Sequence, residues 1–300
     1  GAGPVVEWAV WMKELDASTF LSHRLREGRC SSGHIEQIAT TLCAFYQAQP
    51  AMAGNAALLA TQRVQSFVHE NFVAIRKFTF VPSSVIDAIE SFCKAFEQSC
   101  AGLLTRRANE GRIRDGHGDL HSEHISLNEQ GTINIFDCLE FNEDLRVTDV
   151  ACDLAFLAMD LDFNQRHDFS TLLIQRATSL LSDSELQTVI PYYQCYRACV
   201  RCKVELLHSD AETASEPERM TARTTAERYL RLALRYSLTG TERCIVAFMG
   251  GVASGKSFLA GQLSDITGWK VFSSDRIRKD IAGIAANHRG SEEHTSELQS

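Results

Sequence analysis

Apolar residues recur at intervals of three and four over most of the chain up to residue 236, which is the spacing of an amphipathic helix. The segment from Ser31 to about Gln49 is the clearest case, because the Ser31-Ser32 pair at its start is typical of a helix N-cap. The same spacing predicts helices over residues 55–78, 83–100, 148–160, 168–181, 184–208 and 216–236. We expect Ser83 and Ser84 to cap the helix over residues 83–100. We also expect the helix over 184–208 to break or weaken near Pro191, which lacks a backbone N–H.

Short runs rich in β-branched and aromatic residues predict strands instead. They span residues 5–12, 132–136, 244–249 and 269–272. A glycine in the segment 237–241 is typical of the end of a helical region, and we place the domain boundary there. The sequence thus predicts a mostly helical α+β domain over residues 1–237, a linker over 238–242 and the beginning of an α/β domain over 243–290.

The second domain opens with a phosphate-binding motif. Residues 250–257 fit the pattern G-x-x-x-x-G-K-S/T, and they lie between a predicted strand and a predicted helix. Gly250 and Gly255 allow backbone N–H groups to curl around phosphate oxygens, while Lys256 adds a positive charge and Ser257 can hold Mg²⁺. The motif predicts a P-loop that binds ATP with Mg²⁺.

Asp275 follows the second predicted strand of this domain. The segment resembles small P-loop kinases, and the resemblance implies that Asp275 faces the acceptor and acts as a base, with Arg276 or Arg278 near phosphate. The alternative is that Asp275 only caps a helix over residues 276–284. About fifty residues cannot form a complete doubly wound sheet, so we expect further strands after Gly290 and an exposed apolar sheet face in this part of the chain.

A second phosphate-handling pattern lies in the helical domain, where a histidine- and aspartate-containing loop precedes the strand 132–136 and Asp137. Phosphoryl transfer requires a carboxylate near the acceptor hydroxyl and ligands for a metal that neutralises the phosphates. Asp119 is the candidate for the first role and Asp137 for the second, as a Mg²⁺ ligand. We expect His117 to brace the loop. The alternative is that both aspartates only cap turns.

Three segments together resemble the aminoglycoside-phosphotransferase-like family, in the branch that fuses this domain to a P-loop ATPase or kinase domain. They are His117-Gly118-Asp119-Leu120-His121, residues 136–142 and residues 149–160. The resemblance covers about Val5 to Gly290, in the family's domain order. It implies a protein-kinase-like fold, ATP and Mg²⁺ as cofactors, and a small hydroxylated acceptor. The family pattern H-G-D-x-x-x-x-N places the second metal ligand at His124, where the family has asparagine and this chain has a softer donor.

The family also implies a glycine-rich loop and an ATP-binding lysine before the strand at residues 5–12, and neither precedes it here. We therefore expect the chain to be a fragment that does not phosphorylate a substrate at its first site. Residues 291–300 resemble a translated sequencing adapter, and we expect them to be a non-native tail.

The composition of the chain argues against several classes of binding partner. The net charge is −8, from 30 basic and 38 acidic residues without a basic run, so nucleic acid is not an expected partner. Ten cysteines without a paired CxxC pattern do not form a disulfide scaffold or a zinc ribbon. We find no secretory signal and no apolar run near the roughly 20 residues of a membrane span, and we expect a cytoplasmic protein that does not bind membranes.

Two other functions fit the same residues. In the first, His124 marks a degenerate kinase domain that binds nucleotide and regulates without transferring phosphate. In the second, His117, His121 and His124 hold zinc in a metal-dependent hydrolase, with Asp119 and Asp137 as further ligands. The main prediction is an ATP-dependent phosphotransferase in the intact protein.

Overall fold

The computed structural model describes residues 14–128, 131–240, 244–251 and 253–283, and over these ranges the protein is mostly helical with few, short strands. Its contacts divide the chain into two units, Gly1–Arg243 and Cys244–Ser300. The strand expected over residues 5–12 lies outside the described residues. Within them, no helix is long and apolar enough to cross a membrane.

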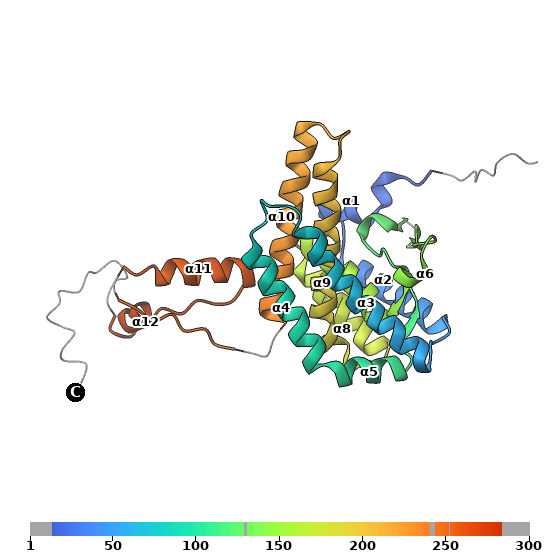
Figure 1. The fold of residues 1–300 in the computed structure, drawn as a ribbon, viewed down its shortest axis with the longest axis horizontal. Coiled ribbons are helices and arrows are strands. Elements are labelled where there is room, and N and C mark those ends of the chain that lie inside the picture. Colours follow the sequence, from blue (N-terminus) through green and yellow to red (C-terminus); the bar gives the residue numbers. More distant parts are fainter. Residues whose placement is uncertain (1–13, 129–130, 241–243, 252, 284–300) are drawn as a thin grey trace, which may run out of the picture. The chain divides into compact units, whose positions relative to one another are not determined.

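The first unit contains ten α-helices among its described residues (Figure 1): α1 (Leu21–Arg26), α2 (Ser32–Ala48), α3 (Gly54–Ile75), α4 (Ser83–Ser99), α5 (Ala101–Asn109), α6 (Glu143–Arg146), α7 (Val150–Phe163), α8 (His167–Leu180), α9 (Leu186–Asp210) and α10 (Glu216–Thr239). The same ranges contain two 3₁₀ turns and four strands: η1 (Ala17–Thr19), η2 (Ser122–His124), β1 (Ile113–Asp115), β2 (Ile125–Leu127), β3 (Ile133–Ile135) and β4 (Val147–Asp149).

Helix α7 is the centre of this unit. Every residue from Val150 to Asp162 is buried, and a helix that is apolar on all sides belongs in the interior of a domain. Helices α8 and α9 pack against α7, α2 packs against α8, and α10 packs along α9. Three cysteines of α9, Cys195, Cys199 and Cys202, are buried in this core.

Capping confirms the predicted start of α2 and corrects the predicted cap of α4. Ser31 accepts a hydrogen bond from the His34 N–H (3.4 Å) and begins α2. The predicted serine cap of α4 is wrong, because Ser83 is already helical and Pro82 occupies the cap position without a side-chain bond. A proline suits that place, since the first helical turn has N–H groups without carbonyl partners in any case.

The predicted break near Pro191 is also wrong, because α9 runs continuously from Leu186 to Asp210. Pro191 lies in the second turn of the helix and removes one N–H donor there. Its neighbours Ile190 and Tyr192 are buried in the core, so packing outweighs the lost hydrogen bond.

The four strands of the first unit form two short antiparallel pairs. Strand β1 pairs with β4, so that Ile113 lies opposite Asp149, and β2 pairs with β3, so that Ile125 lies opposite Ile135. Isolated two-stranded pairs are marginally stable. These pairs are held by the helical core, into which Ile113 and Ile125 are buried.

The second unit, in its described residues, contains α11 (Lys256–Thr267) and α12 (Ser274–Ile281). The strands predicted over 244–249 and 269–272 are not formed in this structure, where both segments are irregular. Among the described residues neither segment pairs with a neighbouring strand, and a strand needs such a partner to satisfy its backbone groups. Apolar side chains there are exposed as a result, among them Ile245 (97%), Met249 (91%) and Phe272 (77%).

Arg107 is fully buried in the first unit and lies between two buried carboxylates. Its Nε and Nη2 atoms donate to Asp149 at 2.7 and 2.9 Å, and Nη1 and Nη2 donate to Asp183 at 2.8 and 2.9 Å. Burial opposes the charge of Arg107, but the two carboxylates outweigh it and raise the pKa of the guanidinium. This triad connects α5 to the segments before α7 and α9.

Replacing Arg107 with alanine leaves Asp149 and Asp183 buried without a counter-ion. We expect Arg107→Ala to lower the free energy of unfolding by about 3–5 kcal/mol. The measurement is urea unfolding followed by circular dichroism. Arg106→Ala is the control, because Arg106 pairs with Glu185 at the surface, where a pair contributes about 0–1 kcal/mol. Equal losses in the two variants would contradict the buried triad.

Candidate functional site

The β2–β3 pair brings two of the predicted site residues together. His124 immediately precedes β2 and Asp137 follows β3 by two positions, and the Phe136 N–H donates to the His124 carbonyl oxygen (3.1 Å). This register places the side chains of His124 and Asp137 side by side, with 3.2 Å between His124 Nε2 and Asp137 Oδ2. The short distance follows from backbone pairing.

The loop between β1 and β2 carries Asp119 and is held by α7. The Asp153 carboxylate, which is 1% exposed, accepts hydrogen bonds from the N–H groups of His117 (2.5 Å) and Gly118 (2.9 Å) and from the Tyr46 hydroxyl (3.2 Å). Two turns further along α7, Asp160 accepts a hydrogen bond from the Ser122 N–H (2.8 Å). Residues seven apart lie on one face of a helix, so a single face of α7 holds both ends of the loop.

His117 braces this loop, as expected from the sequence. Its Nε2 atom lies 2.8 Å from the Phe136 carbonyl oxygen, and its Nδ1 atom lies 3.4 Å from the Asp119 backbone nitrogen. Because a carbonyl oxygen only accepts, Nε2 carries the proton and Nδ1 accepts from the Asp119 N–H. Both ring nitrogens are therefore engaged by the main chain, and His117 is not available as the third zinc ligand.

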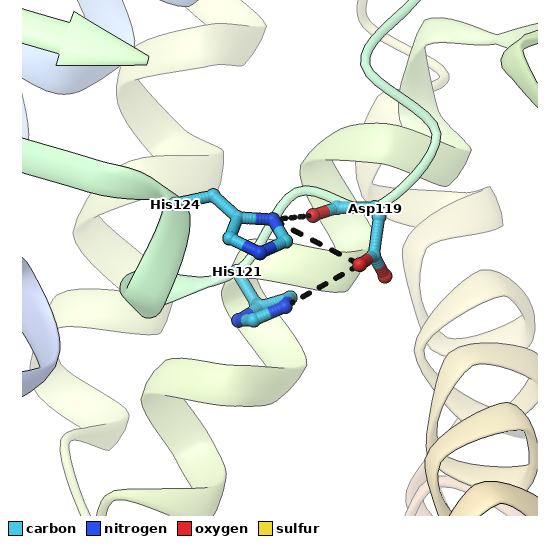
Figure 2. A group of neighbouring side chains, drawn as sticks. All are labelled: Asp119, His121 and His124. Carbon is cyan, nitrogen blue, oxygen red and sulfur yellow. Dashed lines mark hydrogen bonds and ion pairs between the residues drawn. The ribbon is translucent and has the colours of Figure 1, made fainter. Parts of the chain in front are cut away.

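Asp119, His121 and His124 form a cluster of neighbouring side chains (Figure 2). Asp119 Oδ2 lies 3.5 Å from His121 Nε2 and 3.8 Å from His124 Nδ1, and one ligand atom from each residue falls within 4.8 Å of the others. His124 Nδ1 is closest to the Asp119 carbonyl oxygen, at 2.9 Å. The structure thus brings Asp119 and Asp137 to opposite nitrogens of one imidazole ring.

The charges of this cluster favour an ionised Asp119. Burial opposes ionisation, but the hydrogen bond and charge of His121 and the charge of His124 outweigh it, so the pKa of the Asp119 carboxyl lies below its ordinary value. Burial and the neighbouring charge of His121 lower the pKa of His124, against the opposing effect of the two aspartates. At neutral pH the site therefore holds an anionic Asp119 beside a neutral His124 ring.

Asp137 lies in the left-handed region of backbone conformation, with φ of 62°, and its side chain is 73% exposed. Aspartate is one of the few residues other than glycine that tolerates this conformation. The turn directs the carboxylate back toward His124 from the open side of the site. Non-glycine residues in this region are concentrated at functional sites.

The predicted P-loop of the second unit has a tightly curled backbone. Gly250, Ala253 and Gly255 have φ values of 153°, 63° and 82°, and α11 begins directly afterwards at Lys256. The Lys256 ammonium donates to the carbonyl oxygens of Gly250 (2.8 Å) and Gly251 (2.5 Å). The loop, the lysine and the first turn of α11, which contains Ser257, thus lie together at a helix N-terminus.

Asp275 lies in the first turn of α12, is 78% exposed and forms an ion pair with Lys279 (3.1 Å). The alternative role of Asp275 as the cap of this helix is wrong, because Ser273 is the N-cap and accepts a hydrogen bond from the Arg276 N–H (3.4 Å). The carboxylate is open to solvent and near a cation of its own helix.

Sequence reasoning missed the role of Asp153 as the residue that holds the loop. Asp149 does cap α7, through the Ala151 N–H (2.9 Å), whereas Asp153 turns to the loop. A signal was present, since Asp153 and Asp160 interrupt an otherwise apolar stretch at an interval of seven residues. A buried carboxylate requires hydrogen-bond donors, and loop N–H groups are the commonest unpaired ones.

Comparison with known proteins gives relatives without a described activity. No protein-family model matches this chain. Uncharacterized proteins of Mycobacterium tuberculosis and Mycobacterium bovis are 32% identical to it over 287 residues. The match covers 93% of the chain and 55% of each relative, so the chain spans about half the length of these relatives. Among solved structures, an ethanolamine kinase of Plasmodium vivax aligns with 67% of this chain and 60% of its own, with 15% identity and a TM-score of 0.42.

Changing Asp153 to asparagine tests whether its carboxylate holds the loop. The amide offers one acceptor oxygen where two N–H groups need partners, so Asp153→Asn is expected to cost roughly 1–3 kcal/mol of stability. Amide hydrogen exchange at His117 and Gly118 should accelerate in parallel. Asp115→Asn is the control, since Asp115 pairs with Arg146 at a partly exposed position. Unchanged exchange at His117 and Gly118 would show that Asp153 does not hold this loop.

Proposed function

We propose that the first unit carries the catalytic loop and metal site of an ATP-dependent phosphotransferase that acts on a small hydroxylated substrate. The observation that supports this most is the position of Asp119 and Asp137 at the two nitrogens of His124, with distances of 3.8 and 3.2 Å. They come from a loop and a strand end that are separated in sequence. A pair of aspartates that only capped turns has no reason to converge on one ring.

In this proposal Asp119 receives and orients the acceptor hydroxyl. Its lowered pKa keeps the carboxylate ionised, and an anionic carboxylate aligns an O–H group by accepting its hydrogen bond. Asp137 and His124 would hold a divalent cation, which would supply positive charge to neutralise the phosphates of ATP, the phosphoryl donor. Asp153 and His117 fix the loop, so that Asp119 is in place before the acceptor binds.

The second unit is proposed to bind another nucleotide. Gly250 and Gly255 shape the loop, Lys256 contacts phosphate in place of the carbonyl oxygens that it now meets, and Ser257 holds Mg²⁺. Asp275 is proposed as a base that faces a second acceptor. Its exposure leaves room for a substrate hydroxyl.

The proposed setting is the cytoplasm, with nucleotide and a small alcohol as partners and neither nucleic acid nor membrane among them. The residues of the site define a reaction on a hydroxyl group and do not select an aminoglycoside. A protein-kinase-like fold is proposed from the same loop, strand and aspartate order. A regulatory module that binds nucleotide without transferring phosphate is the rival outcome of the activity test.

Asp119→Asn is expected to abolish phosphate transfer. The complete gene product that contains this chain is supplied with ATP, Mg²⁺ or Mn²⁺ and a panel of small alcohols, and transfer to each alcohol is measured. Loss of the carboxylate should lower kcat by about 10²–10⁴-fold, the usual contribution of a positioned acid–base group. Folding of the variant is checked by circular dichroism.

The control is Asp144→Asn, at an exposed residue that pairs with Arg63 outside the cluster. It should leave the rate unchanged. ATP binding without transfer to any alcohol, by both the unchanged protein and the control, would favour the regulatory module. Transfer that survives Asp119→Asn would reject the role of this carboxylate.

Lys256→Ala is expected to weaken nucleotide binding to the second unit by at least about tenfold, because the variant removes the cation that meets the phosphates. Binding of ATP to this chain is measured by calorimetry, with Asp119 unchanged. Lys270→Ala, an exposed lysine beyond α11, is the matched control. Equal affinities in the two variants would contradict a phosphate-binding role for Lys256.

A further inference from the structure

The ring of His124 has one orientation of its proton in this structure. Nδ1 lies 2.9 Å from the Asp119 carbonyl oxygen, and a carbonyl oxygen can only accept a hydrogen bond. Nδ1 therefore carries a hydrogen, and in a neutral ring Nε2 carries a lone pair. A metal-binding histidine in a protein almost always has this arrangement, with its other nitrogen donating to a carbonyl or carboxylate oxygen.

The lone pair on Nε2 faces an anion. Asp137 Oδ2 lies 3.2 Å away, so this nitrogen and this oxygen face each other across a gap that a proton on Nε2 or a metal ion can occupy. The separation suits two ligands of one metal, since bonds of about 2.0–2.1 Å in tetrahedral geometry place ligand atoms about 3.3 Å apart. In octahedral geometry the same bonds place neighbouring ligand atoms about 2.9 Å apart.

We infer that the cation site formed by His124 Nε2 and Asp137 Oδ2 selects a transition-metal divalent cation, such as Zn²⁺, Co²⁺ or Mn²⁺, over Mg²⁺. This inference rests on the metal site of the proposed function and names its cation. Mg²⁺ prefers oxygen ligands and keeps its waters, whereas an imidazole nitrogen binds first-row transition metals well. A histidine in place of an amide oxygen therefore changes which metal the site prefers.

The cluster of Asp119, His121 and His124 is a less suitable centre for this cation. The His124 nitrogen recorded beside the Asp119 carboxylate is Nδ1, at 3.8 Å, and it already donates to the Asp119 carbonyl oxygen. Without His124, the cluster keeps only Asp119 Oδ2 and His121 Nε2, which lie 3.5 Å apart. The two sites use different nitrogens of one ring, so variants of His121 and Asp137 separate them.

The test measures metal affinity in this chain by isothermal titration calorimetry, without ATP or an acceptor. We expect Zn²⁺, Co²⁺ and Mn²⁺ each to bind at least about tenfold more tightly than Mg²⁺. His124→Asn should remove this preference, and Asp137→Asn should weaken binding of all four metals. Affinity for Mg²⁺ equal to or above that for the transition metals would overturn the inference.

Three variants serve as controls. Cys138→Ser excludes a contribution from the exposed thiol beside Asp137, and His208→Asn excludes binding to a surface histidine. His121→Gln should keep the metal preference if Nε2 of His124 is the ligand. The opposite result would be loss of the metal preference in His121→Gln together with unchanged metal affinity in Asp137→Asn. It would place the metal in the cluster of Asp119, His121 and His124 and overturn the site formed by His124 and Asp137.

A measurement on the unchanged protein guards against variants that do not fold. In ¹⁵N NMR spectra of the histidine rings, Zn²⁺ should shift the Nε2 signal of His124 while Nδ1 keeps its proton. A shift at Nδ1, or a ring that only titrates with pH and ignores Zn²⁺, would show that a proton bridges His124 and Asp137. Metal affinity is measured without phosphate transfer. The metal preference can therefore hold if the activity test fails, and the activity test can succeed if the metal preference is absent.

Discussion

The carboxylates of Asp153 and Asp160 tie the loop between β1 and β2 to the central helix. Both are buried on one face of α7, where an ionised group needs hydrogen-bond donors to remain in the interior. The donors are N–H groups of the loop, at His117, Gly118 and Ser122. Asp153 also accepts a hydrogen bond from the Tyr46 hydroxyl, and Asp160 accepts one from the Asn164 amide, so the loop completes the hydrogen bonding of both carboxylates and is thereby coupled to the core.

Close packing makes this arrangement specific. A Cβ atom at Gly116 would lie 2.6 Å from Asp153 Oδ2, so only a glycine lets the chain pass the carboxylate here. Gly118 adopts φ of 82° and would bring a Cβ within 2.9 Å of the Leu139 side chain. The second site is built by a different principle. Its loop curls through Gly250 and Gly255, and Lys256 donates to the loop's own carbonyl oxygens.

Local patterns in the sequence predicted the structural features that depend only on residues close together in the chain. Helical spacing located α2, α3 and α4, and the Ser31 cap fixed where α2 begins, because these features act within a few residues. The strands at 244–249 and 269–272 were predicted wrongly, since a strand also needs a distant partner that composition does not reveal. The partners of Asp153 lie more than thirty positions away, which is why its role was missed.

His124 shows how one residue can keep a geometry and change its chemistry. Its Nδ1 hydrogen bonds to the Asp119 carbonyl oxygen, a bond within five residues that ties the 3₁₀ turn to the loop. The β2–β3 register independently directs Nε2 toward Asp137. An asparagine amide also offers a donor and an acceptor, so it can make the same backbone bond and direct its oxygen to the cation. In the proposed site, the exchange of an amide oxygen for an imidazole nitrogen would leave this backbone bond in place and change the ligand offered to the metal.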